Sequence, residues 1–152
     1  MAGMDRLERV CGGTTGPLTE AVVLMARSLF DDLHPAAGWP ALIHGDSHPG
    51  NFLRSGDGSW RAIDPKGVIG DPLFDAANLA TELPGVAPGD LKGATLRRVA
   101  ILSEMMGVDR AVLSDWCVVR CVLSAWWSLD DHGEGWGPAM HAAELFAERR
   151  RR

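Results

Sequence analysis

Three polar residues that could bind a metal ion and accept a proton stand close together in the sequence. Asp46 belongs to the segment His44-Gly45-Asp46, Asn51 follows it by five positions, and Asp64 ends a short apolar segment. Carboxylate and amide oxygens are the hard ligands that magnesium prefers. A carboxylate can also take the proton of an attacking hydroxyl group. The residue types therefore predict a site for magnesium and for group transfer.

The spacing of these residues is that of a protein-kinase catalytic loop, H-R-D-x-x-x-x-N. In such loops the Asp accepts or orients the hydroxyl proton, while the Asn and a later strand-end Asp hold magnesium on the phosphates. The segment HGDSHPGN has the same spacing. A loop would place Asp46 and Asn51 on one backbone segment, and a hairpin after it would return Asp64 to them.

Two segments in order, HGDSHPGNFL and AIDPKGVIGDPLFDAANL, resemble the aminoglycoside and hydroxyurea antibiotic-resistance kinases, the streptomycin 6-kinase-like family. The resemblance extends over roughly residues 17–150. It implies a mainly helical α+β fold, the C-terminal catalytic lobe of a protein-kinase-like (aminoglycoside phosphotransferase) fold with a small β-hairpin at the catalytic loop. We expect that lobe at residues 17–152, after an irregular entry segment at residues 1–16.

The resemblance also implies roles for individual residues. Asp46 looks like the catalytic base, Asn51 and Asp64 like magnesium ligands, and His44 like a buried histidine that supports the loop backbone. ATP would be the co-substrate with Mg²⁺, and the acceptor would be a hydroxyl group of an aminoglycoside-like small molecule, with hydroxyurea or a sugar alcohol as other possibilities.

Four neighbouring residues have two readings each. His48 could support the loop or approach the phosphates. Lys66 could meet a phosphate or be an ordinary exposed lysine. Asp71, before Pro72, is favoured as a helix N-cap over a family-specific role. Asp75 could tie down the catalytic loop or simply favour the helix N-terminus.

A competing reading makes His44, Asp46 and His48 ligands of zinc or iron, since alternate histidine and carboxylate side chains can converge on a metal. It leaves Asn51 and the IDPKGVIGDP segment without a role.

Farther along the chain, acidic residues could attract a polycationic substrate, although acidic loop residues are usually only solvated; they are Asp130, Asp131 and Glu134.

The elements that must position the site follow from periodicity and turn signals. Apolar residues at three- and four-residue steps predict a helix from Pro17 to about His34, ended by the segment Pro35 to Pro40. Short apolar runs predict three strands, and Ser55-Gly56-Asp57-Gly58 predicts a tight turn between the last two. The predicted strands are 41–43, 52–54 and 60–63, and the later helices are 72–83, 90–106, 109–129 and 138–150.

A kinase also needs a nucleotide-binding N-terminal lobe with a glycine-rich strand-turn-strand. The segment CGGTTGP does not fit that motif, so we expect this lobe to be absent from the chain. Two hypotheses follow: a truncated or split kinase whose lobe is a separate polypeptide, or an inactive remnant or non-enzymatic binding module. The uncovered apolar surface would favour self-association or marginal stability.

Composition limits the other classes of function. A net charge of -5 argues against a nucleic-acid partner, and Arg149 to Arg152 read as a solvated helix end. The charged first residues do not fit a secretory leader, and no run of eighteen uncharged apolar residues predicts a membrane span, so we expect a cytoplasmic protein. The three cysteines favour reduced thiols, with Cys117 and Cys121 in the core. The tryptophans of the helical half are also predicted core residues; they are Trp116, Trp126, Trp127 and Trp136.

Overall fold

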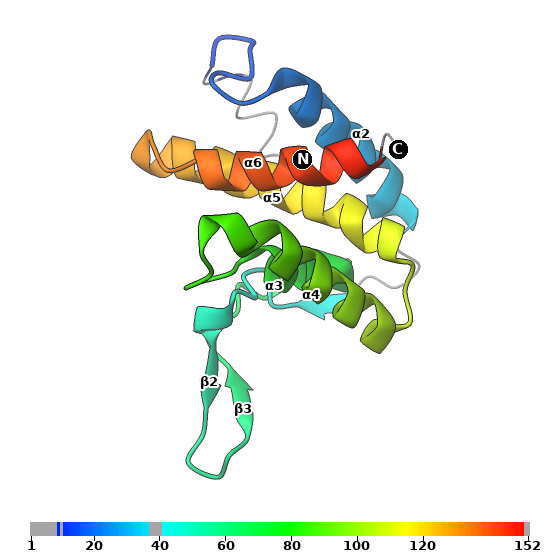
Figure 1. Ribbon diagram of the computed structural model, residues 1–152, viewed down its shortest axis with the longest axis vertical. Coiled ribbons are helices and arrows are strands. Elements are labelled where there is room, and N and C mark those ends of the chain that lie inside the picture. Colours follow the sequence, from blue (N-terminus) through cyan, green and yellow to red (C-terminus); the bar gives the residue numbers. More distant parts are fainter. Residues whose placement is uncertain (1–8, 10, 37–40, 151–152) are drawn as a thin grey trace. The chain divides into compact units, whose positions relative to one another are not determined.

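We describe the fold from a computed structural model, which places residues 9, 11–36 and 41–150 (Figure 1). The predicted entry segment 1–16 and the terminal arginine run lie partly outside these residues. The chain divides into two compact units, one formed by Met1–Pro35 with Ser114–Arg152 and the other by Ala36–Leu113. All the residues of the candidate site, from His44 to Asp75, belong to the second unit.

The first unit is helical. Its helices are α2 (Glu20–Ala36), most of α5 (Arg110–His132) and α6 (Gly137–Arg150). Phe30 of α2 packs edge-on against Trp116 of α5, with ring centroids 6.1 Å apart. Arg150 Nε donates to Asp115 Oδ1 at 2.9 Å, which ties the end of α6 to α5. Burial of the α5 side chains, Trp116 and Cys117 among them, makes this helix the centre of the unit.

Three details of this unit differ from the sequence-based prediction. Helix α2 begins at Glu20 rather than at Pro17, because Leu18 N donates to Thr15 O and closes a separate turn. The same helix continues to Ala36, past the predicted end at His34. Trp127 is 39% exposed, so its assignment to the core was wrong; Arg120 lies over its ring at 5.0 Å instead. Trp116 and Trp126 are buried as predicted.

Helix α5 is long and apolar enough to cross a membrane when judged by length and composition alone. Of its most apolar eighteen-residue window, 61% is buried inside the fold. Core helices of water-exposed domains have the same composition, so this feature is weak evidence for a membrane span.

The second unit carries four strands of three residues each and two helices. The strands are β1 (Ala41–Ile43), β2 (Phe52–Arg54), β3 (Trp60–Ala62) and β4 (Val68–Gly70); the helices are α3 (Pro72–Thr81) and α4 (Leu91–Met106), with short 3₁₀ turns η1 (Pro49–Asn51) and η2 (Pro88–Asp90). Strands β2 and β3 form the predicted antiparallel hairpin, while β1 pairs antiparallel with β4. Strand β4 was not predicted, since only two apolar residues, Val68 and Ile69, lie between Gly67 and Gly70.

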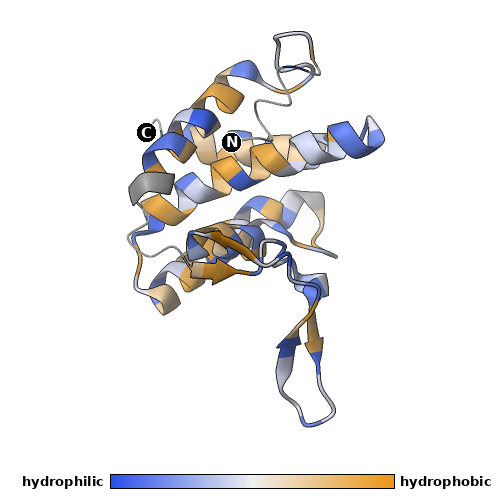
Figure 2. Ribbon diagram, turned by 180° about the vertical axis from the view of Figure 1, so that it is seen from behind, coloured by the Kyte–Doolittle hydropathy of each residue, from blue (hydrophilic) through white to orange (hydrophobic). Residues whose placement is uncertain are grey.

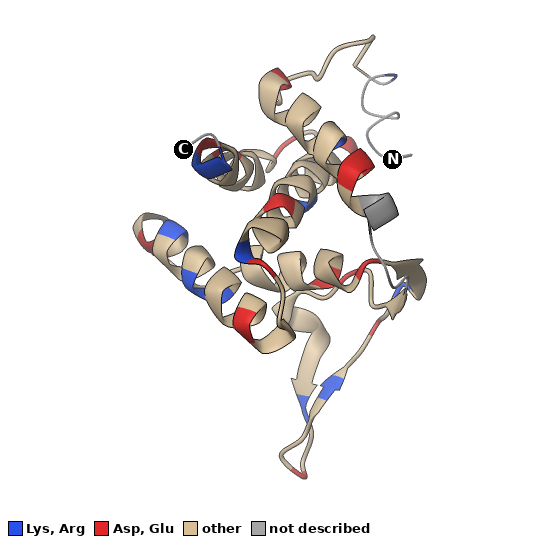
Figure 3. Cartoon of the chain, turned by 90° about the vertical axis from the view of Figure 1, so that its right-hand side faces the viewer, with Lys and Arg blue, Asp and Glu red and all other residues tan. Residues whose placement is uncertain are grey.

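The β2–β3 hairpin projects from the rest of its unit (Figure 1). Its turn closes through a hydrogen bond from Gly58 N to Ser55 O at 2.9 Å, and Gly58 takes the positive φ of 83° that glycine tolerates. Arg54 and Arg61 lie on its two strands and Asp57 lies at its tip (Figure 3). The hairpin is therefore a solvent-facing element that exposes charged residues and also the apolar Leu53 and Trp60, which are 51% and 68% exposed. Its base is the part that meets the candidate site.

Helix α3 is fixed at both ends. Asp71 Oδ1 accepts a hydrogen bond from Leu73 N at 2.8 Å, so the predicted N-cap is confirmed. At the other end Arg98 of α4 donates from Nη1 to the carbonyl oxygens of Leu79 and Glu82. The first turn of α3 thus has a defined position, and that turn carries Asp75. The mainly helical structure with few short strands agrees with the predicted α+β class.

Candidate active site

The HGDSHPGN loop begins where β1 ends, and Asp75 holds its backbone. His44 N donates to Asp75 Oδ2 at 2.7 Å, and Gly45 N donates to Asp75 Oδ1 at 3.0 Å. Ser47 Oγ donates to the carbonyl oxygen of Asp75 at 2.8 Å. Both carboxylate oxygens are therefore used on the loop, which favours the predicted tie over a mere preference for the helix N-terminus.

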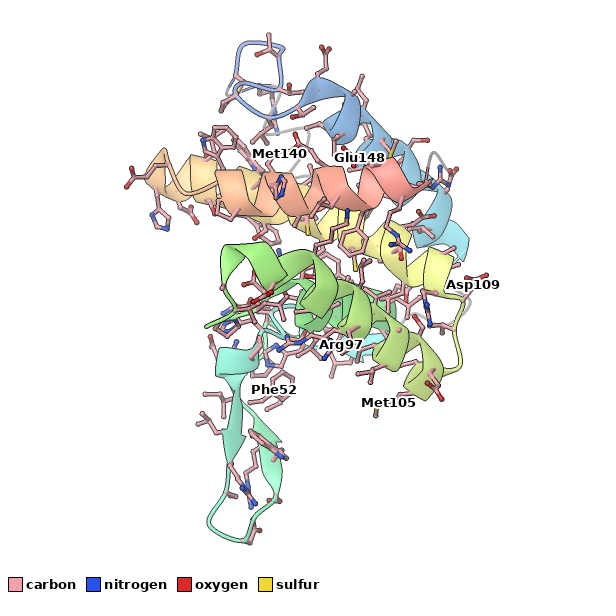
Figure 4. The ribbon with its side chains drawn as sticks, in the orientation of Figure 1. Phe52, Arg97, Met105, Asp109, Met140 and Glu148 are labelled. Atoms are coloured by element: carbon pink, nitrogen blue, oxygen red, sulfur yellow. The ribbon has the colours of Figure 1, made fainter. Side chains whose placement is uncertain are left out.

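The ring of His44 links the start of the loop to the end of the hairpin. Its Nδ1 accepts from Asp46 N at 3.2 Å, and its Nε2 donates to Ile63 O at 2.8 Å. The ring also stacks on Phe52, with centroids 6.1 Å apart, at the base of the hairpin (Figure 4). His44 supports the loop geometry as the resemblance implies, but it is half-buried rather than buried, because this part of the loop faces solvent.

Gly45 has a conformation and a close contact that exclude a side chain. Its φ is 79°, and a Cβ there would come within 2.9 Å of Val68 Cγ2 and 3.3 Å of Lys66 Cβ. Real Cβ atoms essentially never approach so closely. Glycine at this position therefore lets the loop turn directly beneath strand β4.

Asp46 and Asn51 lie together on the loop. Asn51 is buried, and its Nδ2 donates to the backbone oxygen of Asp46 at 2.9 Å. Asn51 O accepts from Ile63 N at 2.9 Å, which joins the loop to the residue before Asp64. Because the amide nitrogen is engaged, the amide oxygen Oδ1 is the atom that Asn51 can offer to a cation. The Asp46 side chain is 30% exposed.

Asp64 follows the hairpin in a strained backbone conformation. Its φ of 54° makes it the one non-glycine residue with positive φ in the described part of the chain. Such conformations cost free energy and are concentrated at functional sites. The side chain is 68% exposed and contacts Lys66. Strain and exposure together hold a carboxylate out toward solvent near Asp46.

Lys66 forms ion pairs with both carboxylates of the site. Its Nζ is 2.9 Å from Asp64 Oδ2 and 3.7 Å from Asp46 Oδ2. The hydrogen bond and the charge of Lys66 lower the pKa of Asp64 below its ordinary 3.8, and the same two effects of Asp64 raise the pKa of Lys66 above 10.5. The stabilising effect of the pair is thus complete between these ordinary values. It is lost as the pH falls through the lowered pKa of Asp64 or rises through the raised pKa of Lys66.

The contacts of His48 favour support of the loop over an approach to the phosphates. It is the N-cap of η1, where its Nδ1 accepts from Gly50 N at 3.1 Å. Its Nε2 lies 4.0 Å from Asp46 Oδ2, so the ring also borders the carboxylate.

Ser47, which sequence reasoning did not single out, is 2% exposed and anchors the loop to α3. A serine in a polar loop gives no signal of burial.

The competing zinc or iron reading finds no support in this geometry. Across the described residues, no three His, Cys, Asp or Glu side chains are placed to hold a metal ion. Both ring nitrogens of His44 already form hydrogen bonds, with Asp46 N and Ile63 O, and the Nδ1 of His48 accepts one from Gly50 N. The acidic residues Asp130 and Asp131, at the end of α5, belong to the other unit.

Comparison with known proteins agrees with the family that the motifs resemble. Residues 5–132 match the family described as "Aminoglycoside/hydroxyurea antibiotic resistance kinase". A streptomycin 6-kinase of Streptomyces glaucescens is 32% identical over an alignment 152 positions long, which covers 90% of this chain and 48% of that protein. A streptomycin 3''-kinase of Klebsiella pneumoniae is 37% identical over an alignment of 93 positions, which covers 59% of this chain and 35% of that protein.

A hydroxyurea phosphotransferase of Kitasatospora aureofaciens is 34% identical over an alignment of 139 positions, which covers 85% of this chain and 39% of that protein. The chain thus spans about half, or less, of the length of each of these relatives. No solved structure matches it.

Proposed function

Because this chain belongs to the aminoglycoside/hydroxyurea antibiotic resistance kinase family, we propose that it carries the catalytic loop of a small-molecule kinase. That kinase moves the γ-phosphate of ATP to an alcohol group of an aminoglycoside-like molecule. The observation that supports this most directly is the cluster formed by Asp46, Asn51 and Asp64, joined by an amide hydrogen bond and by a shared lysine.

Asp46 is the general base in this proposal. Its carboxylate takes the proton of the acceptor alcohol as the alcohol oxygen bonds to the γ-phosphorus, and the bond from that phosphorus to the bridging oxygen breaks to release ADP. The loop backbone must hold Asp46 still for this step, since phosphoryl transfer depends mostly on positioning. The hydrogen bonds from His44 N and Gly45 N to Asp75 provide that restraint.

The donor set of the site fits magnesium. Asn51 Oδ1 and the Asp64 carboxylate are hard oxygen ligands, and both residues lie next to the base of the hairpin. When bound there, Mg²⁺ would neutralise negative charge on the phosphate oxygens. The hydrogen bond from Asn51 Nδ2 to the backbone oxygen of Asp46 would hold the metal ligand Asn51 and the base Asp46 at a fixed separation.

The substrate class is proposed from relatives named for streptomycin and hydroxyurea. Streptomycin is the first molecule to test because two of those relatives act on it by name. ATP binding needs further residues: the described strands are four, each of three residues, and none lies in a glycine-rich nucleotide loop. We therefore propose that a separate nucleotide-binding lobe completes the site. The alternative is a catalytically inactive remnant or a non-enzymatic small-molecule-binding module.

The direct experiment incubates the purified chain with radiolabelled ATP, Mg²⁺ and streptomycin, and compares it with Asp46→Asn. If the chain is active without a further lobe, labelled streptomycin forms with the native chain and decreases about 10²-fold or more in the variant, the usual contribution of a general base. Transfer that does not exceed the level of Asp46→Asn would show that this chain alone is not an enzyme.

Calorimetry distinguishes a non-enzymatic binding module from a kinase. Streptomycin that binds the chain with equal affinity in the native and Asp46→Asn forms, without any transfer of phosphate, would favour a binding module. An upstream reading frame that encodes a glycine-rich lobe would favour a split kinase instead.

A further inference from the structure

A single ammonium group lies between the two carboxylates of the candidate site. Lys66 Nζ contacts Asp64 Oδ2 at 2.9 Å and lies 3.7 Å from Asp46 Oδ2. The chain has only one other lysine, Lys92, which is exposed on α4. The cationic side chain at this site therefore has a natural control elsewhere on the same unit.

The base of Lys66 is fixed while its tip is free to move. Its backbone nitrogen donates to His44 O at 2.7 Å, and its Cβ and Cγ lie over Gly45. The side chain is nevertheless 51% exposed. A lysine has a flexible four-carbon stem and a compact charge, so the ammonium group can leave Asp64 without any change in the backbone.

The ammonium group is hydrogen-bonded to Asp64 Oδ2, a carboxylate oxygen that would also bind a divalent cation. Asp64 has two carboxylate oxygens, and Lys66 is bonded to one of them. An ammonium ion and a metal ion carry charge of the same sign, so both are disfavoured on one carboxylate at the same time. Binding of a metal by Asp64 must therefore weaken or displace the contact with Lys66.

We infer that Lys66 is a tethered counter-ion of this site, which offsets one of the two negative charges of Asp46 and Asp64 before a metal binds and turns to the phosphate when the metal binds Asp64. This inference rests on the proposed function, because it assumes that Asp64 is a metal ligand. Once displaced, the ammonium group stays within reach of Asp46 and has three N–H donors for phosphate oxygens. Lys66 then binds the group that is transferred next to the base.

The first test measures binding of Mn²⁺ alone to the full chain by electron paramagnetic resonance. Lys66→Met keeps the stem against Gly45 but removes the competing charge, so we expect it to bind Mn²⁺ about twofold to fivefold more tightly, the range that an exposed ion pair contributes. Lys92→Met makes the same change in net charge and should bind like the native chain. Asp64→Asn should lose most of the binding.

The second test repeats the titration with Mn²⁺ and tripolyphosphate together. Here the order should reverse: Lys66→Met should bind the complex more weakly than the native chain, and Lys66→Arg should restore binding at least in part. A purely structural role for Lys66 would shift both titrations in one direction, so the opposite signs identify the exchange between carboxylate and phosphate.

The outcomes separate the two proposals. Equal Mn²⁺ affinity in Lys66→Met and the native chain, or weaker binding in the variant, would overturn the counter-ion inference while leaving the metal site intact. Mn²⁺ binding that does not depend on Asp64 would instead overturn the metal site itself. Weaker Mn²⁺-tripolyphosphate binding in Lys92→Met, by as much as in Lys66→Met, would reduce the second effect to net charge.

Discussion

At the scale of single residues, Asp75 holds the backbone of the HGDSHPGN loop from outside that loop. Its carboxylate accepts one hydrogen bond on each oxygen, from His44 N and from Gly45 N. Hydrogen bonds to a charged acceptor are stronger than those between neutral groups. The residue lies thirty positions from the loop in sequence, so the restraint exists only after α3 has folded against it.

Asp75→Asn tests this restraint. An amide has one acceptor oxygen, and its NH₂ group would face the second backbone N–H, so one donor of the loop loses its partner. We expect the free energy of unfolding to fall by about 1–3 kcal/mol, the cost of an unsatisfied, partly buried group. Urea denaturation followed by circular dichroism measures it.

Asp109→Asn is the matched control for that variant. Asp109 Oδ1 accepts one hydrogen bond from Ala111 N at 2.7 Å, at the start of α5, and an asparagine oxygen can accept the same bond. Its effect should stay below about 0.5 kcal/mol, since Asn and Asp are similar N-caps. An equal loss in the two variants would mean that the carboxylate of Asp75 has no special role.

At the scale of elements, α5 organises its helical unit by burying side chains along much of its length. Cys117 is fully buried and Cys121 is 2% exposed, one helical turn apart, as the sequence predicted. Burial raises the pKa of the Cys117 thiol well above its ordinary 9.0, and the charge of Cys121 adds to that effect. A thiolate is the reactive form of cysteine. Both the burial of Cys117 and its raised pKa therefore protect it from reaction.

Thiol labelling therefore reports on the packing of α5. Iodoacetamide at pH 8 should modify one cysteine per folded chain, the half-exposed Cys11, and all three after denaturation. Mass spectrometry of the peptides identifies the modified positions. If Cys117 reacts in the folded chain as fast as Cys11 does, α5 is not the buried centre of its unit.

At the scale of the whole molecule, the second unit exposes apolar side chains on the β1–β4 ribbon. Leu42 and Ile69 stand opposite each other in the register and are 73% and 69% exposed. Both strands of the ribbon are hydrophobic along their length (Figure 2). Exposed apolar side chains of this kind favour association.

We predict that the chain self-associates or is marginally stable, and that the ribbon contributes to this. The double variant Leu42→Thr with Ile69→Thr should lower the fraction of oligomer in light scattering at a given concentration. Leu24→Thr with Met105→Thr replaces two exposed apolar residues on other elements and should have less effect. A compact, highly stable monomer would contradict the prediction.

The local parts of the site could be predicted from sequence because their signals are local. HGDSHPGN fixes the separation of Asp46 and Asn51 along one loop, Asp57-Gly58 specifies the turn of the hairpin, and Asp71-Pro72 marks the start of α3. These choices depend on the backbone preferences of adjacent residues. The hairpin and the N-cap followed from them without any tertiary information, whereas the family was indicated by the resemblance of two motifs.

Tertiary structure alone decided how the separate segments meet. Sequence reasoning left Asp75 and Lys66 with two readings each, did not find strand β4 or the burial of Ser47, and assigned Trp127 to the core. The contacts of Asp75 with the loop and of Lys66 with Asp46 form only after chain segments far apart in sequence have come together. Spacing determines which groups are available, whereas packing determines which of them touch.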